Sequence, residues 1–253
     1  MSAEPAVSAG LSDWFAGEPT AKIAPHIPRT TPLETTLLRA EIAARSLPIT
    51  RLADLTPLDR LGLPVFCAVT PLARDLTTHM GKGLTPMAAR VSAIMEAIER
   101  IAAETPPPES RRTSRTALLA EGKKALDPNS LALPPDTAYN ADATLAWSAA
   151  IDLGRAGTPI WLPTDLVICP ALDGVIGQAD TNGLASGNTR LEAVLHGLCE
   201  VIERDAAGRF LFADLYAEPG DRVMPPRRID PRTMPQESRA LVDRMAGEGL
   251  QIV

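Results

Sequence analysis

The spacing of apolar residues predicts several helices along the chain. Residues 33–46, LETTLLRAEIAARS, have the pattern of an amphipathic helix. A long helix is expected over about 86–104, with Thr85 as its N-cap and three prolines just beyond its end. A second long helix is expected over about 189–214, and a shorter one over about 236–247. The chain is therefore rich in helices, two of which are long.

Short apolar runs between these helices predict strands. Residues 63–69, LPVFCAV, have the length and the residue types of a buried strand. Residues 145–152 and 158–168 flank a turn with two glycines, which predicts a hairpin. Residues 1–30 have no sustained period and are expected to form an arm or an edge segment, and 105–137 a surface connection with one short helix. The fold class expected is α+β, with mixed sheets packed against helices.

Composition, net charge and the number of cysteines exclude several classes of protein. The 253 residues include 25 Lys and Arg against 31 Asp and Glu, a net charge of −6, which argues against a nucleic-acid partner. The 45% hydrophobic and 22% charged residues are ordinary for a soluble globular chain. Three scattered cysteines are too few for a disulfide framework or a zinc cage. With no signal peptide and no apolar run long enough to span a bilayer, we expect a cytoplasmic protein without a membrane partner.

An internal repeat is the most informative feature of the sequence. The pentapeptide EAIER at 96–100 recurs as EVIER at 200–204, and both copies lie in the predicted long helices. On helical wheels each copy aligns its two glutamates along one polar stripe: Glu96 with Glu99, and Glu200 with Glu203. The second helix also carries a separate apolar stripe, formed by Leu191, Leu195, Leu198 and Ile202. The two helices therefore present the same pair of carboxylates.

These paired carboxylates allow two interpretations. Carboxylates three or four residues apart repel each other, by about 0.2–0.5 kcal/mol per pair on an isolated helix. A hard divalent cation would use that charge, and Mg²⁺ commonly shares carboxylates with substrate phosphates. A Glu-x-x-Glu-Arg sequence is, however, most often a solvated helix face. The near-verbatim repeat and the alanines and glycines beside both copies favour a packed site, and the pattern alone leaves both interpretations open.

Residues close to the repeat also have ordinary structural explanations. Thr189 and Glu192 have the spacing of a capping box, so Glu192 can simply satisfy a helix N-terminus. His196 has no second histidine nearby and is expected to be structural, and Cys199 is expected to be a small buried hydrophobe. The glycines on either side of Lys82 lack the spacing of a Walker A loop and are expected to form a turn.

Two segments resemble the signatures of the YcaO family. Residues 81–100, from GKGLTP to EAIER, resemble the first signature, and residues 182–206, from NGLASGN to EVIERDA, resemble the second. A weaker likeness extends over about 50–216. The resemblance implies an N-terminal arm and helix over 1–47 and a YcaO-like ATP-binding domain, incomplete at its C-terminus, over 48–253. It also implies that the two long helices lie adjacent around a nucleotide site.

The resemblance implies a set of site residues around ATP and Mg²⁺, in a site without a P-loop. The positions that match the family's nucleotide-binding residues are Ser92, Asn188, Glu192 and Arg204, with Lys82 as a further candidate near the phosphates. The positions that match its Mg²⁺-binding carboxylates are Glu96, Glu99, Glu200 and Glu203. The carboxylate positions agree with the helical wheels, and the match favours a ligand role for Glu192 over a simple cap.

The resemblance also implies an activity and its partners. YcaO proteins use ATP to phosphorylate the oxygen of a peptide backbone amide, so that a nucleophile adds to the carbon and phosphate leaves with that oxygen. A neighbouring Cys, Ser or Thr side chain then gives an azoline, and sulfide gives a thioamide. The implied partners are a peptide or protein substrate, a TfuA-like or E1-like protein, and a second copy of the chain in a homodimer.

The length of the chain keeps other functions open. Family domains are considerably longer, so the 253 residues are expected to stop in the middle of a structural unit. The sequence ends in an apolar segment at 250–253 that looks like the entry to a strand. The alternatives are a non-catalytic accessory protein for another modification enzyme, such as one for ribosomal-protein methylthiolation, and an inactive truncated remnant.

Overall fold

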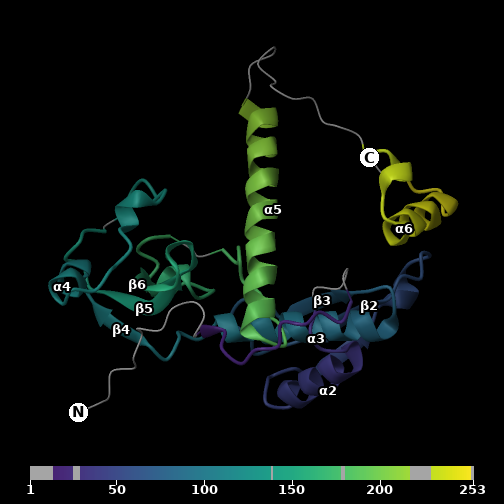
Figure 1. Cartoon of the computed structure of the whole chain (residues 1–253), viewed down its shortest axis with the longest axis horizontal. Helices are drawn as coiled ribbons and strands as arrows, with labels where there is room; N and C mark the ends of the chain where they lie inside the picture. The colour runs from purple at the N-terminus through teal and green to yellow at the C-terminus, as the bar shows by residue number, and fades with distance from the viewer. Residues whose placement is uncertain (1–13, 25–28, 138, 178–179, 217–228, 252–253) are drawn as a thin grey trace.

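The protein has an α+β fold with two small sheets around the base of one long helix. The structure is a computed structural model, and it describes residues 14–24, 29–137, 139–177, 180–216 and 229–251. The long helix, α5 (Arg190–Tyr216), rises from between the two sheets (Figure 1). The expected α+β class is confirmed, and each sheet is purely antiparallel.

The first sheet carries the helix that holds the first glutamate pair. Its strands β1 (Arg51–Asp54), β2 (Val65–Val69) and β3 (Thr78–Lys82) pair in that order. Helix α3 (Pro86–Ala103) packs on β2 and β3, and helix α2 (Leu33–Ala44) packs on α3. The N-cap expected at the start of α3 is confirmed, because the threonine hydroxyl that precedes it accepts a hydrogen bond from the third residue of the helix.

Small residues bring α3 unusually close to this sheet. The core between them is built from Ala68 of β2 and from Ala93 and Ala97 of α3. Gly81 of β3 faces the same helix, and a Cβ atom added there would lie only 2.0 Å from the backbone nitrogen of Ala93. The turn expected around Lys82 is therefore wrong, since Gly81 and Lys82 pair with β2 as part of a strand. The glycine is needed for close packing rather than for a turn.

The second sheet forms a separate core on the other side of α5. Its strands are β4 (Ser110–Thr113), β5 (Leu145–Asp152) and β6 (Thr158–Pro163), and the predicted hairpin of β5 and β6 is confirmed. Helix α4 (Arg115–Ala120) is the short helix expected between 105 and 137. The buried residues that form the core beside this sheet are Leu118, Tyr139, Leu145, Trp147 and Ile176.

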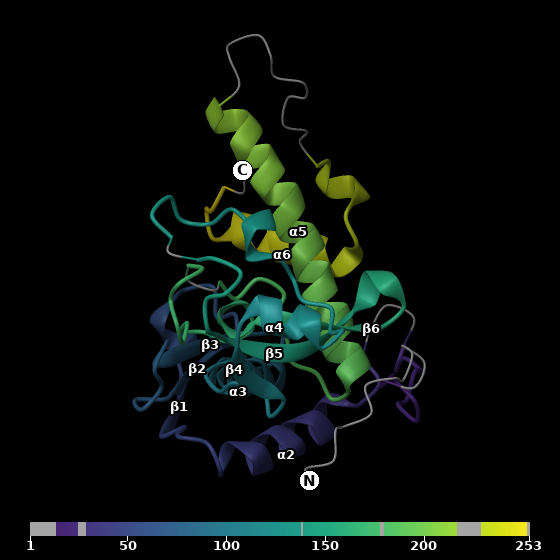
Figure 2. The same cartoon turned by 90° about the vertical axis from the view of Figure 1, so that its left-hand side faces the viewer.

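Helix α5 extends beyond both sheets (Figure 2). From Val201 onward every side chain described on this helix is exposed, and the apolar stripe of its first half is exposed at Leu195, Leu198 and Ile202. Cys199 is likewise exposed, so the expectation of a buried thiol is wrong. Within the described residues, the far half of α5 has no packing partner that buries it.

The remaining elements are short. Helix α6 (Gln236–Gly247) agrees with the prediction for that segment. Single 3-10 turns lie at Thr56–Leu58, Pro128–Ser130, Leu153–Arg155, Thr164–Leu166 and Pro231–Thr233. The strand expected from residue 250 does not begin at 250 or 251, and residues 252–253 lie outside the described part. No described helix is long and apolar enough to cross a membrane.

Candidate functional site

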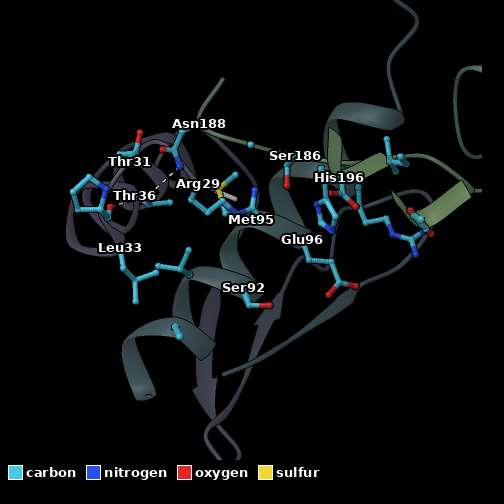
Figure 3. Close-up of a pocket in the computed structure, with 18 of the residues that line it drawn as sticks. Arg29, Thr31, Leu33, Thr36, Ser92, Met95, Glu96, Ser186, Asn188 and His196 are labelled. Carbon is cyan, nitrogen blue, oxygen red and sulfur yellow. Dashed lines mark hydrogen bonds between the residues drawn. The ribbon is translucent and has the colours of Figure 1, made fainter. Parts of the chain in front are cut away.

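A cavity of about 780 Å³ lies where α3, α5 and the N-terminal segment meet (Figure 3). One wall is the polar side of α3. A second wall is the loop 181–188 with the first turns of α5, and a third is the segment that runs from Ile23 into α2. The volume lies within the range of roughly 300–1,000 Å³ that is usual for small-molecule and cofactor sites.

The cavity brings together residues of both sequence motifs. Six of the residues implied by the resemblance line it, namely Ser92, Glu96, Glu99, Asn188, Glu200 and Arg204. The first three come from α3, the fourth from the loop, and the last two from α5. The two long helices are therefore adjacent around one cavity, as expected. They meet there at the base of α5, which then rises away from α3 (Figure 1).

Three other expected site residues lie outside the cavity lining that the structure describes. Lys82 is exposed on β3, yet its charge is close enough to Glu96 to oppose the rise that burial causes in the pKa of that carboxyl. Glu203 is exposed on α5, one residue before Arg204 of the lining. Glu192 is buried behind the wall. The four glutamates of the repeat are thus not all directed into the same space.

Burial raises the pKa of both glutamates that α3 contributes to the cavity lining. Burial raises the pKa of Glu96, and the positive charges of Arg100 and Lys82 only partly oppose it. Burial also raises the pKa of Glu99, against a hydrogen bond from Ser186 and the charge of His196, while Glu96 adds to the increase. The positive charges and hydrogen bonds around Glu96 and Glu99 therefore do not fully offset the cost of burying their negative charges. A cation in the cavity would stabilise the ionised forms of both side chains.

The donor set fits Mg²⁺ held jointly with a phosphate group. The described residues contain no group of three or more His, Cys, Asp or Glu gathered tightly enough to hold a metal by themselves. Mg²⁺ usually keeps several waters and takes one or two carboxylates together with substrate phosphates. Glu96 and Glu99 on the α3 wall and Glu200 on the α5 wall suit that mode of binding, and Glu200 also pairs with Arg204 at 2.8 Å.

Glycines set the loop directly against α5. A Cβ atom at Gly197 would lie 2.5 Å from the carbonyl oxygen of Gly183, and one at Gly187 would lie 2.7 Å from the backbone nitrogen of Ala193. Gly183 also has a φ of +81°, which favours glycine. These contacts explain the glycine-rich sequence, because they hold Ser186 at the cavity close to Glu99.

Glu192 joins the N-terminal segment to the loop. Its Oε1 atom accepts hydrogen bonds from the backbone nitrogen of Thr30 at 2.6 Å and from the Thr30 hydroxyl at 2.8 Å. Its Oε2 atom accepts one from the backbone nitrogen of Asn188 at 2.9 Å, and Arg29 lies 3.7 Å away. Burial acts to raise the pKa of Glu192, but these partners outweigh it and the pKa is lowered.

The capping box expected at this helix start forms only in part. The backbone nitrogen of Glu192 donates to the Thr189 hydroxyl at 3.1 Å, as such a box requires. The Glu192 carboxylate, however, accepts from Asn188 instead of from Thr189. Glu192 is therefore more than a cap, because it also holds a segment that is far away in the sequence.

The N-terminal wall of the cavity was not predicted from the sequence. Arg29, Thr31 and Leu33 line it, and Thr36 accepts a hydrogen bond from the Asn188 amide at 3.0 Å (Figure 3). No periodic pattern or motif marks the part of this segment before the predicted helix at 33–46, and nothing in that helix's pattern indicates a site. His196, expected to be structural, also lines the cavity and is exposed, and its charge acts on Glu99.

Comparisons with known proteins agree with this arrangement. Residues 80–253 match the family model described as YcaO cyclodehydratase, ATP- and Mg²⁺-binding. An uncharacterised protein of Methanothermobacter thermautotrophicus is 43% identical over 169 residues, which cover 64% of this chain and 42% of that protein. A Rhizobium leguminosarum bv. trifolii protein, described as lying in the tfuA 3′ region, is 35% identical over 208 residues, which cover 79% of this chain and 44% of that one. The chain thus spans less than half the length of these curated relatives.

Solved structures show the same fold. YcaO from Methanopyrus kandleri, bound with AMPPCP and Mg²⁺, superposes with a TM-score of 0.60 at 26% identity, over 85% of this chain and 52% of that one. A heterocyclase in complex with substrate and cofactor superposes with a TM-score of 0.58 at 24% identity, over 71% of this chain and 28% of that one. The second likeness concerns the fold alone.

Proposed function

The chain belongs to the YcaO family, and from that membership we propose that its cavity binds ATP with Mg²⁺ and serves the ATP-dependent modification of a peptide backbone. The observation that carries the proposal is the convergence of both glutamate-bearing helices on one cavity. The M. kandleri protein, which is similar over most of this chain, binds an ATP analogue and Mg²⁺. Both ligands suit a cavity lined by carboxylates, three arginines and hydroxyl groups.

The residues of the cavity divide the work of binding. Glu96, Glu99 and Glu200 would supply the carboxylates that hold the cation, and the undercompensated charge of Glu96 and Glu99 favours its entry. Arg204 and the N-terminal Arg29 supply positive charge to the phosphate groups. Ser92 and Asn188 add hydrogen-bonding groups from α3 and from the loop. Lys82, which the structure leaves outside the lining, adds positive charge close to Glu96, and Glu203 has no assigned part in this binding.

The reaction we propose begins at the oxygen of a peptide amide. An amide oxygen is a poor leaving group until it is phosphorylated, and ATP supplies the phosphoryl group. The cavity then has to hold the amide against the nucleotide, keep both in a fixed orientation and neutralise the charge that develops on the phosphate. Arg204 is placed to do so, and Glu96 and Glu99 on α3 would hold a cation that supplies further positive charge.

The product depends on the nucleophile, and one comparison favours a thioamide. The R. leguminosarum relative lies beside tfuA. A TfuA-like partner would supply sulfide, and addition of sulfide to the activated carbon with loss of phosphate gives a thioamide. Azoline formation, with a side chain as nucleophile and an E1-like partner, is the alternative. A homodimer and a cytoplasmic location complete the proposal.

Binding of Mg²⁺-ATP tests the proposal directly. The Glu99→Gln variant keeps the shape of the side chain but removes its charge, so the affinity measured by isothermal titration calorimetry should fall at least about tenfold. Glu121→Gln is the matched control, because Glu121 pairs with Arg111 outside the cavity. A chain that is folded by circular dichroism yet binds no Mg²⁺-ATP, or a Glu99→Gln variant that binds as well as the parent, would contradict the nucleotide site.

Turnover separates an enzyme from an accessory protein. Release of ADP and phosphate should rise when peptide substrates are added together with sulfide and a TfuA-like protein. Binding of Mg²⁺-ATP without any such release would favour the accessory role. Because the chain spans less than half of its curated relatives, the same assay on a full-length relative is the natural positive control.

A further inference from the structure

We propose that Asp75 is a positioning residue of the nucleotide cavity, which pairs with Arg100 and so keeps that arginine from Glu96, leaving the Glu96 carboxylate available to a cation. This inference rests on the proposed function, since it concerns how the same cavity accepts Mg²⁺. It gives a part to the loop between β2 and β3, which lies outside both sequence motifs.

The two copies of the repeat differ in the partner of their arginine. In the second copy Arg204 pairs at 2.8 Å with Glu200, four residues before it. The same pairing in the first copy would join Arg100 to Glu96, yet no ion pair connects these two side chains in the part of the chain that the structure describes. Arg100 instead pairs with Asp75, whose Oδ2 atom lies 3.4 Å from its Nη1 atom.

Arg100 is nevertheless a natural partner for Glu96. A glutamate four residues before a basic residue is a favourable pair on a helix, because these positions are neighbours on the helix surface and the order of the charges suits the helix dipole. Both side chains line the cavity. The charge of Arg100 also opposes the rise that burial causes in the pKa of Glu96, so the two side chains are within electrostatic reach of each other. Asp75 and Glu96 therefore compete for one arginine.

The loop that carries Asp75 is fastened to the end of α3. The Oε1 atom of Glu104 accepts hydrogen bonds from the backbone nitrogens of Arg74 at 2.8 Å and Asp75 at 3.2 Å. The side chains of Asp75 and Arg100 are 26% and 21% exposed, so their pair is better shielded from water than a fully exposed one. The Asp75 carboxylate thus has a fixed position from which to hold Arg100.

The separation of Arg100 from Glu96 matters for the cation. A guanidinium paired with Glu96 would offset the negative charge that attracts Mg²⁺, as Arg204 does at Glu200. With Arg100 held by Asp75, α3 presents Glu96 and Glu99 to the cavity without an arginine paired to either of them among the described residues. Mg²⁺ takes one or two carboxylates together with phosphates, and this pair suits that mode. Binding of the cation should therefore depend more on α3 than on α5.

The Mg²⁺ requirement of ATP binding tests this role. In Asp75→Asn the side chain keeps its shape, but Arg100 loses its charged partner and can pair with Glu96. The Mg²⁺ concentration for half-maximal ATP binding, measured by isothermal titration calorimetry, should rise about three- to fivefold, as expected for a competing and partly exposed ion pair. The affinity for ATP at saturating Mg²⁺ should change much less, because the cation then displaces the arginine.

A double variant separates positioning from a structural role. When Arg100→Gln is added to Asp75→Asn, the freed arginine is gone, so the Mg²⁺ requirement should return to that of the parent. Damage to the loop would not be repaired by this second change. Arg100→Gln alone removes the competing charge and should need no more Mg²⁺ than the parent, which tests the competition even if Asp75→Asn does not fold.

Glu104→Gln is the matched control for charge. It removes another carboxylate near the same loop, but its amide oxygen can still accept from the backbone nitrogens of Arg74 and Asp75. Arg100 keeps its partner in this variant, so the Mg²⁺ requirement should stay that of the parent. Circular dichroism checks that each variant is folded.

The outcomes are distinguishable from those of the proposed function. If the parent binds Mg²⁺-ATP and Asp75→Asn needs no more Mg²⁺, the positioning role is wrong while the nucleotide site stands. An equal rise in the double variant or in Glu104→Gln, or a rise in Arg100→Gln alone, would also overturn it. A rise in Asp75→Asn that the double variant reverses supports it. If the parent binds no Mg²⁺-ATP at all, the proposed function fails, and the positioning role fails with it.

Discussion

His79 is a single buried polar residue that makes the free energy of unfolding depend on pH. It is fully buried on β3, and its Nε2 atom lies 2.8 Å from the Thr70 hydroxyl, whereas its Nδ1 atom is buried with no partner in the described structure. Burial lowers the pKa of His79, and the nearby charge of Arg100 acts in the same direction. The folded protein therefore resists a proton that the unfolded chain accepts near the ordinary pKa of 6.5.

The contribution of His79 to the free energy of unfolding should consequently fall in mild acid, whereas the raised pKa values of Glu96 and Glu99 act in the opposite direction. Above pH 6.5 the histidine is neutral in both states, and below it the unfolded state alone gains a proton. The free energy of unfolding should then drop by up to about 1.4 kcal/mol for each pH unit until the lowered pKa of His79 is reached. Urea titrations of the parent between pH 7.5 and 5 measure this slope.

Two variants identify the residue responsible. His79→Gln can still bond to Thr70 but has no charge to gain, so its slope should be much smaller. His196→Gln removes an exposed histidine and should keep the slope of the parent. Equal slopes in the parent and in His79→Gln would show that another group dominates.

At the scale of elements, the sequence predicted the helices and strands that are marked by nearby residues, such as a capping residue, a proline or a glycine-containing turn. The cap at Thr85 and the prolines after Glu104 bound α3 closely, and the glycine-containing turn identified the hairpin of β5 and β6. Strands β1, β3 and β4 were missed because each has only four or five residues and few apolar ones. In β3 the sequence THMGK owes its conformation to β2 and α3 rather than to its own propensity.

The candidate site was predictable to the extent that it lies on regular helices. The repeat at 96–100 and 200–204 and the helical period predicted a pair of aligned glutamates on each long helix, and the resemblance to YcaO proteins implied that the helices meet. The structure has Glu96, Glu99 and Glu200 in the lining of one cavity. The N-terminal wall was not predictable, because the contact between Thr30 and Glu192 joins residues 162 positions apart and follows no period. The helical period alone also does not distinguish Glu200, which lines the cavity, from Glu203, which lies outside the lining.

Close packing between β3 and α3 makes a sharp prediction about glycine. A Cβ atom at Gly81 would collide with backbone atoms of Ala89 and Ala93, which cannot move without shifting α3. Gly81→Ala should therefore lower the free energy of unfolding by about 1–3 kcal/mol, as overpacking does. It should also weaken Mg²⁺-ATP binding, because α3 carries Glu96 and Glu99.

Gly208→Ala is the matched control. No atom lies within 4 Å of the Cβ position at Gly208 on α5, so alanine there should leave stability unchanged or raise it by up to about 1 kcal/mol through helix propensity. Thermal melts of both variants test the pair. A Gly81→Ala protein as stable as Gly208→Ala would show that α3 does not lie as close to β3 as described.

At the scale of the whole molecule, the far half of α5 is the feature that stands out (Figures 1 and 2). Phe212 is 66% exposed and Leu215 is 72% exposed, and Phe210, Leu211 and Tyr216 are each at least half exposed. These apolar side chains point in several directions around the helix. A helix that is apolar all round is usually buried, so this surface is unusual in water.

Self-association of the chain should therefore depend on α5. The double substitution Phe210→Ser and Phe212→Ser should lower both the binding of a hydrophobic dye and the light scattering that grows with protein concentration. Leu72→Ser is a suitable control, because Leu72 is 80% exposed but lies in the loop between β2 and β3. If both variants scatter light as the parent does, the exposed end of α5 is not the surface that drives association.

The continuity of α5 has a mechanical consequence. Its 27 residues form one helix about 40 Å long at 1.5 Å per residue, and only its first half, up to Arg204, borders the cavity. A small tilt of the part of α5 that borders the cavity therefore produces a larger displacement at the C-terminal end of the helix. A spin label at Phe212 paired with one on β4 would convert a shift of a fraction of an ångström beside the glutamates into a change of distance large enough to measure.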